Sequence, residues 1–317
     1  MPARPDSASV LVTGGTGVVG RAIVRQLLVA GCAVRILSRS GSAAPQPGLS
    51  ICRGDVTRGA DLALALQGCD AVIHCAAEKR DPTAMQAVNV AATRLLLEMA
   101  RDAQLRFLCY LSSVGVIGRT RDSVADEATA CHPMNRYAES KFAAEGIVGQ
   151  GLPGAKVVIL RPTNVFDSQS LATWLRHDFR SRLRQFLIGR ENTHLVYVED
   201  VAAAAVHWSQ APARQGVDTF IVSSDEEGGG TWRELRAALA SICDGAAPQA
   251  RMSTRPGMSA PLWMPQLARL IRHGDRNRGD LVYSSRRLRE AGFCFPYGWR
   301  NGLVEAVGQW HGQWHGQ

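Results

Sequence analysis

The segment YAESK, from Tyr137 to Lys141, places a phenol and an ammonium group four residues apart. Residues 135–148 carry a helical pattern, and side chains with this spacing share one face of a helix. A neighbouring cation stabilises a phenolate, so we expect Lys141 to lower the pKa of Tyr137 enough for proton exchange near neutral pH. The pattern YxxxK alone is a weak signal, because it also arises by chance in amphipathic helices.

A hydroxyl group that could orient a substrate oxygen is offered by the segment YLSSVGVIG, which contains Ser112 and Ser113 at the end of a predicted strand. The residue types alone do not distinguish the two serines. With Tyr137, either serine would form a pair of hydroxyl groups that hold a substrate oxygen while a proton is exchanged.

A glycine-rich segment near the start, TGGTGVVG, has two possible frames. Read from Gly15 it is GxGxxG, and read from Gly14 it is GxxGxxG, with Gly17 and Gly20 as the other two glycines. It follows an apolar run and opens a segment of helical periodicity. Glycine lets backbone N–H groups approach a pyrophosphate, and the positive end of a helix favours the anion. The segment therefore predicts a dinucleotide site.

The phosphate state of that dinucleotide is indicated by RILSRS, at the end of the second predicted strand. An Asp or Glu at this place would bind the 2′-hydroxyl of NAD. The chain has Arg39 and no acid, which favours the 2′-phosphate of NADP. The alternative is that Arg39 is a solvated surface residue, so both NADP and NAD remain candidates.

These segments lie in a regular alternation of elements that predicts an α/β fold with a doubly wound, Rossmann-type parallel sheet. The strands are continuous apolar runs, as expected for a sheet covered on both faces. Ligands of such sheets bind at the carboxyl ends of the strands. Strands are expected at residues 9–12, 33–37, 71–76, 106–113, 156–162 and 219–224, and helices at 18–30, 61–66, 85–103, 135–148 and 200–208.

The pattern becomes irregular after about residue 166, which predicts a second, smaller lobe for substrate binding. Core-like strand and helix patterns return at residues 193–224. We therefore expect a cofactor-binding domain of residues 1–166 plus 193–224, and a substrate-binding lobe built from two segments, residues 167–192 plus 225–317.

Composition narrows the possible functions. The chain has 317 residues, and its net charge of +8 comes from 36 Lys and Arg against 28 Asp and Glu. The basic residues are scattered, so we expect no nucleic-acid partner. No apolar run is long enough for a membrane span, and the start lacks a secretory h-region. The eight cysteines are scattered without CxxC pairs, which fits a reducing compartment and a cytoplasmic location.

Further segments complete a family pattern. They are GDVT (54–57), HCAA (74–77), VNVAAT (88–93), RPTNVF (161–166), HLVYVEDVA (194–202) and the stretch from GDLVYSS to AVGQW (279–310). With the glycine turn, the serine segment and YAESK, they resemble the extended short-chain dehydrogenase/reductase family. That family contains the NAD-dependent epimerase/dehydratases of nucleotide sugars. The resemblance covers nearly the whole chain and selects the frame with Gly14, Gly17 and Gly20.

The resemblance implies roles for individual residues. Counting back from the last glycine of SSVGVIG gives Ser113 as the catalytic hydroxyl, beside Tyr137 as the acid or base and Lys141, which also binds the nicotinamide ribose. Asn164 would lie near a substrate diphosphate, and Arg278 is a further candidate for substrate binding. The implied cofactor-binding residues are Gly14, Thr16, Gly17, Val18, Val19, Arg39, Asp55, Val56, Cys75, Ala76, Ala77, Asn89, Ser112, Tyr137, Lys141, Pro162 and Val165.

The chain also departs from the family pattern. Thr193 and His194 stand where the epimerases commonly have an Arg-Asp pair, so one phosphate-binding arginine is missing. Arg184, Arg190 or Arg278 could replace it, although each could equally be a surface residue. Ile117 stands where an aromatic residue often contacts the sugar, which puts the substrate in doubt.

The first functional hypothesis is an NAD(P)-dependent epimerase, dehydratase or ketoreductase that acts on a nucleotide sugar, in surface polysaccharide synthesis. The second is a reductase or dehydrogenase of a nonpolar ketone or alcohol, as in the steroid and flavonol relatives. The third is a regulatory NAD(P)-binding protein without catalysis, against which the intact Ser113, Tyr137 and Lys141 argue. By resemblance, the helices that hold Asn89 and Tyr137 would pair in a homodimer.

The end of the chain, GQWHGQWHGQ, repeats a four-residue unit. His311 and His315 would share a face if it were helical, but glycines weaken the helix and a third metal ligand is lacking nearby. We expect a disordered terminal duplication and no metal site.

Overall fold

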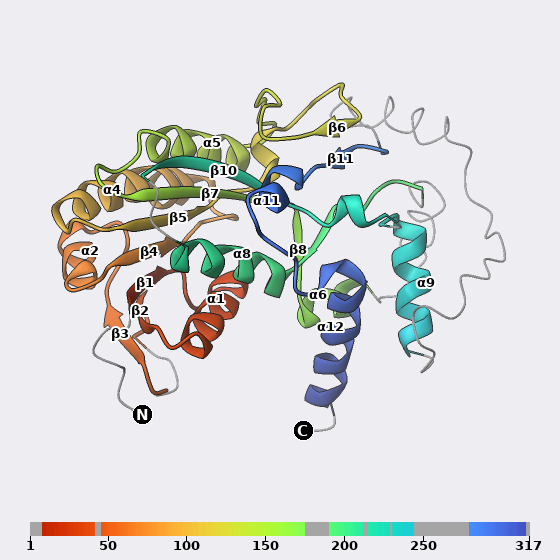
Figure 1. The fold of residues 1–317 in the computed structure, drawn as a ribbon, viewed down its shortest axis with the longest axis horizontal. Coiled ribbons are helices and arrows are strands. Elements are labelled where there is room, and N and C mark those ends of the chain that lie inside the picture. Colours follow the sequence, from red (N-terminus) through yellow and green to blue (C-terminus); the bar gives the residue numbers. More distant parts are fainter. Residues whose placement is uncertain are drawn as a thin grey trace.

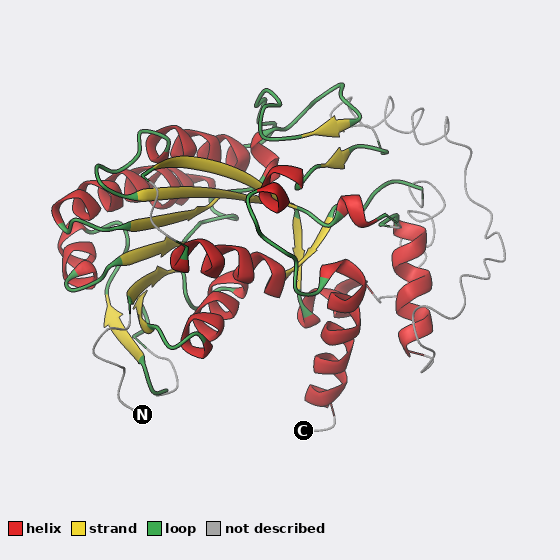
Figure 2. Cartoon of the chain, in the orientation of Figure 1, coloured by secondary structure: helices red, strands yellow, loops and turns green. Residues whose placement is uncertain are grey.

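The computed structural model describes residues 8–41, 46–174, 190–211, 215–228, 230–243 and 279–314. Within them, seven parallel strands form one sheet in the order β10-β7-β5-β4-β1-β2-β3 (Figures 1 and 2). The strands are β1 (Ser9–Thr13), β2 (Ala33–Ser38), β3 (Leu49–Arg53), β4 (Ala71–His74), β5 (Phe107–Leu111), β7 (Lys156–Pro162) and β10 (Gly216–Val222).

The direction of winding reverses between β1 and β4. The chain builds β2 and β3 on one side of β1 and places β4, β5, β7 and β10 on the other. Thr13 pairs with His74 at the carboxyl ends of these two neighbouring strands. The loops that follow β1 and β4 therefore leave the sheet side by side, which is the place where open α/β sheets bind ligands.

Helices cover both faces of the sheet, as Figure 1 shows. One face packs against α1 (Val18–Val29) and α8 (Val198–Gln210), and the other against α2 (Gly59–Leu66), α4 (Ala92–Asp102) and α5 (Arg136–Val148). Because side chains alternate along a strand, Val10 and Val12 enter the first core and Leu11 the second. The predicted α/β class and doubly wound Rossmann-type sheet are confirmed.

The helix expected at residues 85–103 consists of three consecutive pieces. These are α3 (Pro82–Met85), the π-helical segment η1 (Gln86–Ala91) and α4. The wider π turn contains the buried Asn89. Insertions of this kind are common at functional sites, because they redirect side chains without ending the helix.

Strand β3 was not among the expected strands. Its residues, LSICR, are all half-buried or exposed because β3 is the outermost strand of the sheet. Such an edge strand carries no continuous apolar run, so the pattern that identified the central strands does not detect it.

Beyond the sheet, two pairs of short strands connect distant segments. They are β8 (Asn164–Phe166) with β9 (Leu195–Tyr197), and β6 (Val124–Ala125) with β11 (Val282–Tyr283). Around them lie α6 (Ser168–Trp174), η3 (Asp225–Glu227), α9 (Trp232–Cys243), α11 (Arg286–Glu290) and α12 (Gly298–Trp314). Helix α12 packs against α6, β9 and α9. The division into a cofactor-binding domain and a substrate-binding lobe stays a prediction.

The start of α12 is fixed by two carboxylates. Asp200 accepts hydrogen bonds from the N–H groups of Tyr297 and Gly298, both at 2.9 Å, and Glu227 accepts one from Trp299 at 3.1 Å. Burial raises the pKa of Asp200 to about 6. These bonds tie the start of α12 to the first turn of α8 and to η3.

The expectation of disorder at the end of the chain is wrong up to Trp314. Helix α12 continues through Gly308 and Gly312 to that residue, and residues 315–317 lie outside the described part. The helix is already packed upstream, with Leu303, Ala306 and Val307 buried, so its last turns extend a stabilised segment instead of forming alone.

Among the helices that the structure describes, none is both long enough and apolar enough to cross a membrane.

Candidate functional site

The glycine turn after β1 is shaped by two glycines that no other residue could replace. Gly14 has a φ of +68°, and a Cβ atom there would lie 2.6 Å from the backbone nitrogen of Ala76. A Cβ atom at Gly20 would lie 2.1 Å from the carbonyl oxygen of Gly14. Gly17 donates its N–H to the same oxygen at 3.0 Å. A Cβ atom at Gly15 would lie 3.0 Å from the Ile36 side chain and one at Gly17 would lie 3.3 Å from the carbonyl oxygen of Gly14, so the severe backbone collisions are those at Gly14 and Gly20.

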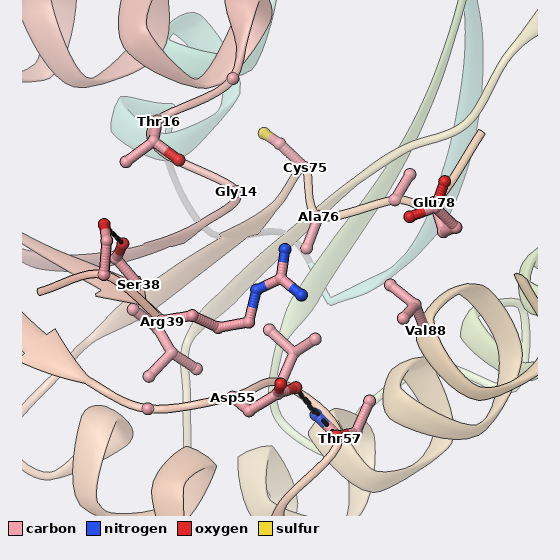
Figure 3. A pocket seen from close by; sticks show the side chains of 16 residues that line it. Gly14, Thr16, Ser38, Arg39, Asp55, Thr57, Cys75, Ala76, Glu78 and Val88 are labelled. Carbon is pink, nitrogen blue, oxygen red and sulfur yellow. Dashed lines mark hydrogen bonds between the residues drawn. The ribbon is translucent and has the colours of Figure 1, made fainter. Parts of the chain in front are cut away.

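A cavity of about 510 Å³ opens beside this turn, at the carboxyl ends of β1, β2, β3 and β4 (Figure 3). Nine predicted cofactor-binding residues line it, namely Gly14, Thr16, Gly17, Arg39, Asp55, Val56, Cys75, Ala76 and Ala77. Its other lining residues are Leu37, Ser38, Ser40, Gly54, Thr57, Glu78 and Val88. Sequence reasoning missed these seven, although each lies within two residues of a predicted one.

Arg39 reaches across the cavity in Figure 3, with its guanidinium group between Ala76 and Asp55. The pKa of Asp55 is lowered, mainly by the N–H of Thr57, with further contributions from the Thr57 hydroxyl group and from Arg39. The N–H of Asp55 donates to Asp61 at 2.8 Å, which fixes the loop after β3. A cation and a carboxylate thus face the same end of the cavity.

The loop after β4 is held by two polar side chains. Asn89 accepts the N–H of Glu78 at 2.7 Å and donates to its carbonyl oxygen at 2.9 Å, and it also donates to Ser140 of α5 at 2.8 Å. The Glu78 carboxylate accepts the N–H groups of the next three residues. Asn89 therefore connects this loop to α5, and it does not line the cavity described above.

Tyr137 and Lys141 both lie on α5, whose first turn is capped by Asn135 through a 2.9 Å bond from the N–H of Ala138. Ser113 precedes the short helix η2 (Val114–Val116), and its hydroxyl oxygen accepts the N–H of Gly115 at 3.1 Å. A Cβ atom at Gly115 would lie 3.4 Å from Ser113 Oγ and 3.7 Å from the Ala138 side chain. Ser113 therefore lies near the first turn of α5.

The charge state of this helix differs from the expectation. Burial raises the pKa of Tyr137 to about 12, so the predicted lowering by Lys141 is not found. Lys141 is only 1% exposed, and burial, with the nearby Lys79, lowers its pKa to about 7. Its Nζ atom lies 4.2 Å from the centroid of the Tyr110 ring. Removal from water dominates here, because it disfavours the phenolate and the ammonium alike.

A buried histidine, to which the sequence assigned no role, lies beneath the site. His74 Nδ1 is 2.5 Å from Thr13 Oγ1, and its Nε2 is 3.1 Å from Thr93 Oγ1. Burial, together with Lys141, lowers the pKa of His74 to about 3, so the ring is neutral. The imidazole links the end of β1 to α4. The apolar strand that precedes HCAA was the available signal for its burial.

Other predicted cofactor-binding residues lie away from the lining of this cavity. Val18 begins α1 and is 42% exposed, while Val19 packs against the core. Pro162 ends β7, and Val165 lies in β8. Ser112 is buried, and its hydroxyl group has no hydrogen-bond partner among the described residues.

The predicted substrate-binding positions have internal partners. Asn164 donates its N–H to the carbonyl oxygen of His194 at 2.7 Å and its amide to that of Thr193 at 2.8 Å. Thr193 is buried and bonds to Gly230 at 2.6 Å. His194 adopts a left-handed φ of 52° and bonds through Nδ1 to Asp225 at 2.7 Å. Thr193, which stands at the position of the missing arginine, is thus an uncharged side chain whose hydroxyl group has an internal partner.

The structure does not add a substrate-binding residue from the remaining candidates. Arg190 is exposed, whereas Arg184 and Arg278 lie outside the described residues. Ile117 is fully buried in a small cluster with Val116 and Tyr283, so it serves as a core residue. In the described part of the chain, acidic, His and Cys side chains do not gather in groups of three or more that could hold a metal ion.

The geometry fits a nicotinamide dinucleotide. Gly14 and Gly20 let the turn pack directly against the loop after β4 and against the start of α1, so that backbone N–H groups at this helix start can face a pyrophosphate. The cavity next to it has polar groups for a ribose and an apolar wall for a flat base. The loop after β4 leads from this cavity to α5 through Asn89. The arrangement can hold a dinucleotide beside a phenol and a hydroxyl group.

Comparisons with known proteins agree with this geometry. The model of the NAD-dependent epimerase/dehydratase family matches residues 10–222. A 3-beta-hydroxysteroid dehydrogenase of Mycolicibacterium neoaurum is 32% identical over 213 residues, which cover 61% of this chain and 57% of the relative. A bovine sterol-4-alpha-carboxylate 3-dehydrogenase is 28% identical over 241 residues, which cover 70% of this chain and 67% of the relative. The chain thus spans little more than half of the first of these relatives.

Among solved structures, the UDP-glucose 4-epimerase of Thermus thermophilus in complex with NAD is similar along its whole length. It superposes with a TM-score of 0.66 at 25% identity, covering 96% of this chain and 99% of the epimerase. The resemblance inferred from the motifs is confirmed.

Proposed function

Because the chain belongs to the NAD-dependent epimerase/dehydratase family, we propose that it binds NAD(P) in the cavity beside Gly14 and transfers hydride to or from a substrate carbon that bears a hydroxyl or keto oxygen. The observation that carries the proposal is the cavity beside the glycine turn, whose wall after β4 is tied through Asn89 to the helix that carries Tyr137 and Lys141.

The nicotinamide supplies or accepts the hydride, and the side chains handle the proton. With a pKa of about 12, Tyr137 holds its proton at neutral pH and can donate it to a ketone oxygen as that oxygen gains negative charge. Ser113 accepts a backbone N–H, which leaves its own hydroxyl hydrogen to donate to the same substrate oxygen. In the reverse direction, the substrate hydroxyl group loses its proton by way of Tyr137.

Lys141 contributes a positive charge that is adjustable. Its pKa of about 7 means that it takes up or releases a proton near neutrality. In our proposal Lys141 binds the nicotinamide ribose and favours the charged states that form at Tyr137 during proton transfer. Its burial against the Tyr110 ring keeps the charge close to the reaction.

We propose NADP as the preferred form of the cofactor, although the solved neighbour carries NAD. Arg39 lines the cavity, flanked by Ser38 and Ser40, and could pair with a 2′-phosphate. Asp55 would remain available for the adenine.

Two classes of substrate are carried forward. A nucleotide sugar, with a place in polysaccharide synthesis, is supported by the full-length similarity to UDP-glucose 4-epimerase. A nonpolar ring alcohol or ketone is supported by the neutral, buried Thr193 in place of a phosphate-binding arginine, and by the dehydrogenase names of two relatives. A homodimer and a cytoplasmic location also stay predictions.

The test is to identify the nucleotide that copurifies and to follow its absorbance at about 340 nm, where reduced nicotinamide absorbs. UDP-, GDP- and dTDP-sugars are added first, followed by hydroxysteroids and flavonol-type ketones. An epimerase or dehydratase gives product without a lasting change in absorbance, whereas a reductase consumes reduced cofactor. Product formation with none of these compounds, despite bound nucleotide, would contradict the proposal and support a regulatory protein.

A further inference from the structure

A buried ion pair lies on α5, one turn beyond Lys141. Glu145 follows Lys141 by four residues, as Lys141 follows Tyr137, so the three side chains form a row along the helix. The carboxylate of Glu145 accepts two hydrogen bonds from Arg161 of β7, at 3.0 Å from Nε and at 2.7 Å from Nη2. Both side chains are less than a tenth exposed. The row that starts at Tyr137 therefore ends in a fixed negative charge.

Lys141 itself has no partner of this kind. Within the described part of the chain its ammonium group makes no hydrogen bond or ion pair, and it lies over the Tyr110 ring. Charged and titratable groups surround it on β4, on β5, on the loop after β4 and on α5 itself, namely His74, Cys75, Tyr110, Lys79, Tyr137 and Glu145. Within this set of described residues, Glu145 is the single carboxylate.

Arg161 fixes how the Glu145 carboxylate can act on Lys141. Side chains of opposite charge at this helical spacing can pair directly, and a direct pair would hold the Lys141 ammonium at Glu145. Here the planar guanidinium group of Arg161 engages both carboxylate oxygens. Glu145 therefore acts on Lys141 through the field of its charge, which raises the pKa of Lys141 against the larger effect of burial. The ammonium group stays free for the nicotinamide ribose.

We propose that Glu145 is a positioning residue for proton transfer at Tyr137, because its carboxylate is the negative charge that keeps the buried Lys141 protonated, while Arg161 holds that carboxylate in place. The inference rests on the proposed function, in which Lys141 assists Tyr137, and extends it to two residues outside the cavity beside Gly14. A purely structural ion pair would fasten α5 to β7 without affecting the proton of Lys141, so experiment can separate the two roles.

The first measurement follows the proton of Lys141 through stability, without substrate or cofactor. The free energy of unfolding of each protein is compared with that of the same protein carrying Lys141→Met, from about pH 5 to about pH 10. The difference stops changing below the pH at which folded Lys141 is protonated, here called the plateau pH. It should be about 7 in the wild type. In Glu145→Gln the plateau pH should fall by about one unit, the lower end of the effect of a nearby opposite charge.

Two further variants keep the test independent of misfolding, because Glu145→Gln leaves Arg161 buried without a negative partner. Glu145→Gln combined with Arg161→Gln removes both charges, and the plateau pH should again fall. Arg161→Lys keeps both charges but loses the two-pronged contact, so the Tm should fall while the plateau pH stays at the wild-type value. An unchanged plateau pH in both Glu145 variants would overturn the proposal and leave the pair a structural one.

Asp218→Asn is the matched control. Asp218 pairs with Lys156 at the opposite end of β7 and with Arg287 at 3.0 Å, so the variant removes a carboxylate from another ion pair of the same strand. The Tm should fall and the plateau pH should stay at the wild-type value. A decrease in the plateau pH equal to that of Glu145→Gln would overturn the proposal in favour of a general effect of net charge.

The pH dependence of turnover is the second measurement, made with a substrate found by the test of the proposed function. In Glu145→Gln the pH at which turnover changes with the proton of Lys141 should fall by the same amount as the plateau pH. Identical pH profiles of turnover in the wild type and in Glu145→Gln would overturn the positioning role. A wild-type protein without turnover of any substrate would count against the proposed function alone, because the unfolding measurement needs neither substrate nor cofactor.

Discussion

The two ends of the candidate site are built by different means. The end beside β1 is a matter of shape, because backbone segments approach so closely at Gly14 and Gly20 that any side chain there would collide with them. The end at α5 is a matter of charge, because Lys141, Tyr137 and the underlying His74 are removed from water and have displaced pKa values. The first end presents fixed backbone groups to a ligand, whereas the second holds side chains whose charge depends on pH.

This difference has a physical consequence. Backbone contacts made by a glycine turn depend little on pH, so cofactor affinity is expected to tolerate changes at α5. Buried titratable groups destabilise the folded chain unless they are neutral or paired, so the α5 end carries a cost in stability. Substitutions at one end should therefore leave a different experimental signature from those at the other.

The largest effect is expected for Tyr137→Phe, which removes the proton donor and keeps the ring. Turnover should fall by roughly 10² to 10⁴, the usual contribution of a positioned acid or base. Cofactor affinity, measured by calorimetry, should change little because the cavity beside Gly14 is untouched. A variant that keeps most of its turnover would refute the role given to Tyr137 and remove the contrast between the two ends.

The next effect is expected for Lys141→Met, which replaces a buried ammonium with an apolar chain of similar length. Turnover should fall by about 10² or more, while the cofactor-free protein should become more stable by roughly 2–4 kcal/mol near neutral pH. Thermal unfolding measures the second quantity. A lower Tm for the variant would contradict the claim that this end of the site is under electrostatic strain.

The pH dependence sharpens the same prediction. Lys141 has an ordinary pKa of 10.5 when unfolded and about 7 when folded, so between these values the unfolded chain binds more protons. The free energy of unfolding of the wild-type protein therefore rises with pH across this window. The stability advantage of Lys141→Met should be largest below about pH 7 and should shrink as the pH approaches about 10. An advantage independent of pH would indicate improved packing instead.

The third effect concerns the shape-dependent end. Gly20→Ala places a methyl group against the carbonyl oxygen of Gly14, so the turn must open. Cofactor affinity should fall by about tenfold or more, with some loss of stability. Gly146→Ala is the control, because Gly146 lies in α5 with nothing within 4 Å of a Cβ atom. The control should raise the Tm slightly and leave affinity unchanged; a loss of affinity in it would show that the assay reports helix stability.

The shape-dependent end was the more predictable from sequence. Steric exclusion at Gly14 and Gly20 permits only glycine, and the central strands are buried on both faces, so residue types alone identify them. Edge strand β3 and the π turn at Asn89 were not predicted, because neither leaves a periodic pattern. Nine of the cavity's lining residues could be named in advance, because the family resemblance implied them motif by motif.

At the charge-dependent end, the sequence predicted which residues lie together but not how their pKa values shift. The spacing of Tyr137 and Lys141 places them on one helix face, yet it carries no information about how deeply the helix is buried. Burial depends on Tyr110, His74 and the loop of Lys79, which come from three other segments of the chain. For this reason the predicted direction of the pKa shift of Tyr137 was wrong: burial raises the pKa, and the sequence had indicated that Lys141 lowers it.

The smallest effect is expected for Arg39→Ser. Arg39 lines the cavity beside the glycine turn, where its side chain, and not the backbone, would distinguish NADP from NAD. Affinity for NADPH should fall by about tenfold, the scale of one charge-assisted bond to a 2′-phosphate, and affinity for NADH should stay nearly the same. Arg58→Ser is the matched control, since Arg58 also acts on Asp55 through its charge but does not line the cavity.

Titration of both variants with both nucleotides gives four affinities. If the two variants lose NADPH affinity equally, the preference comes from net positive charge, and Arg39 does not recognise the phosphate. If neither variant loses NADPH affinity, the cavity that Arg39 lines binds the nucleotide through backbone groups and shape alone. Charged side chains would then matter only at the α5 end.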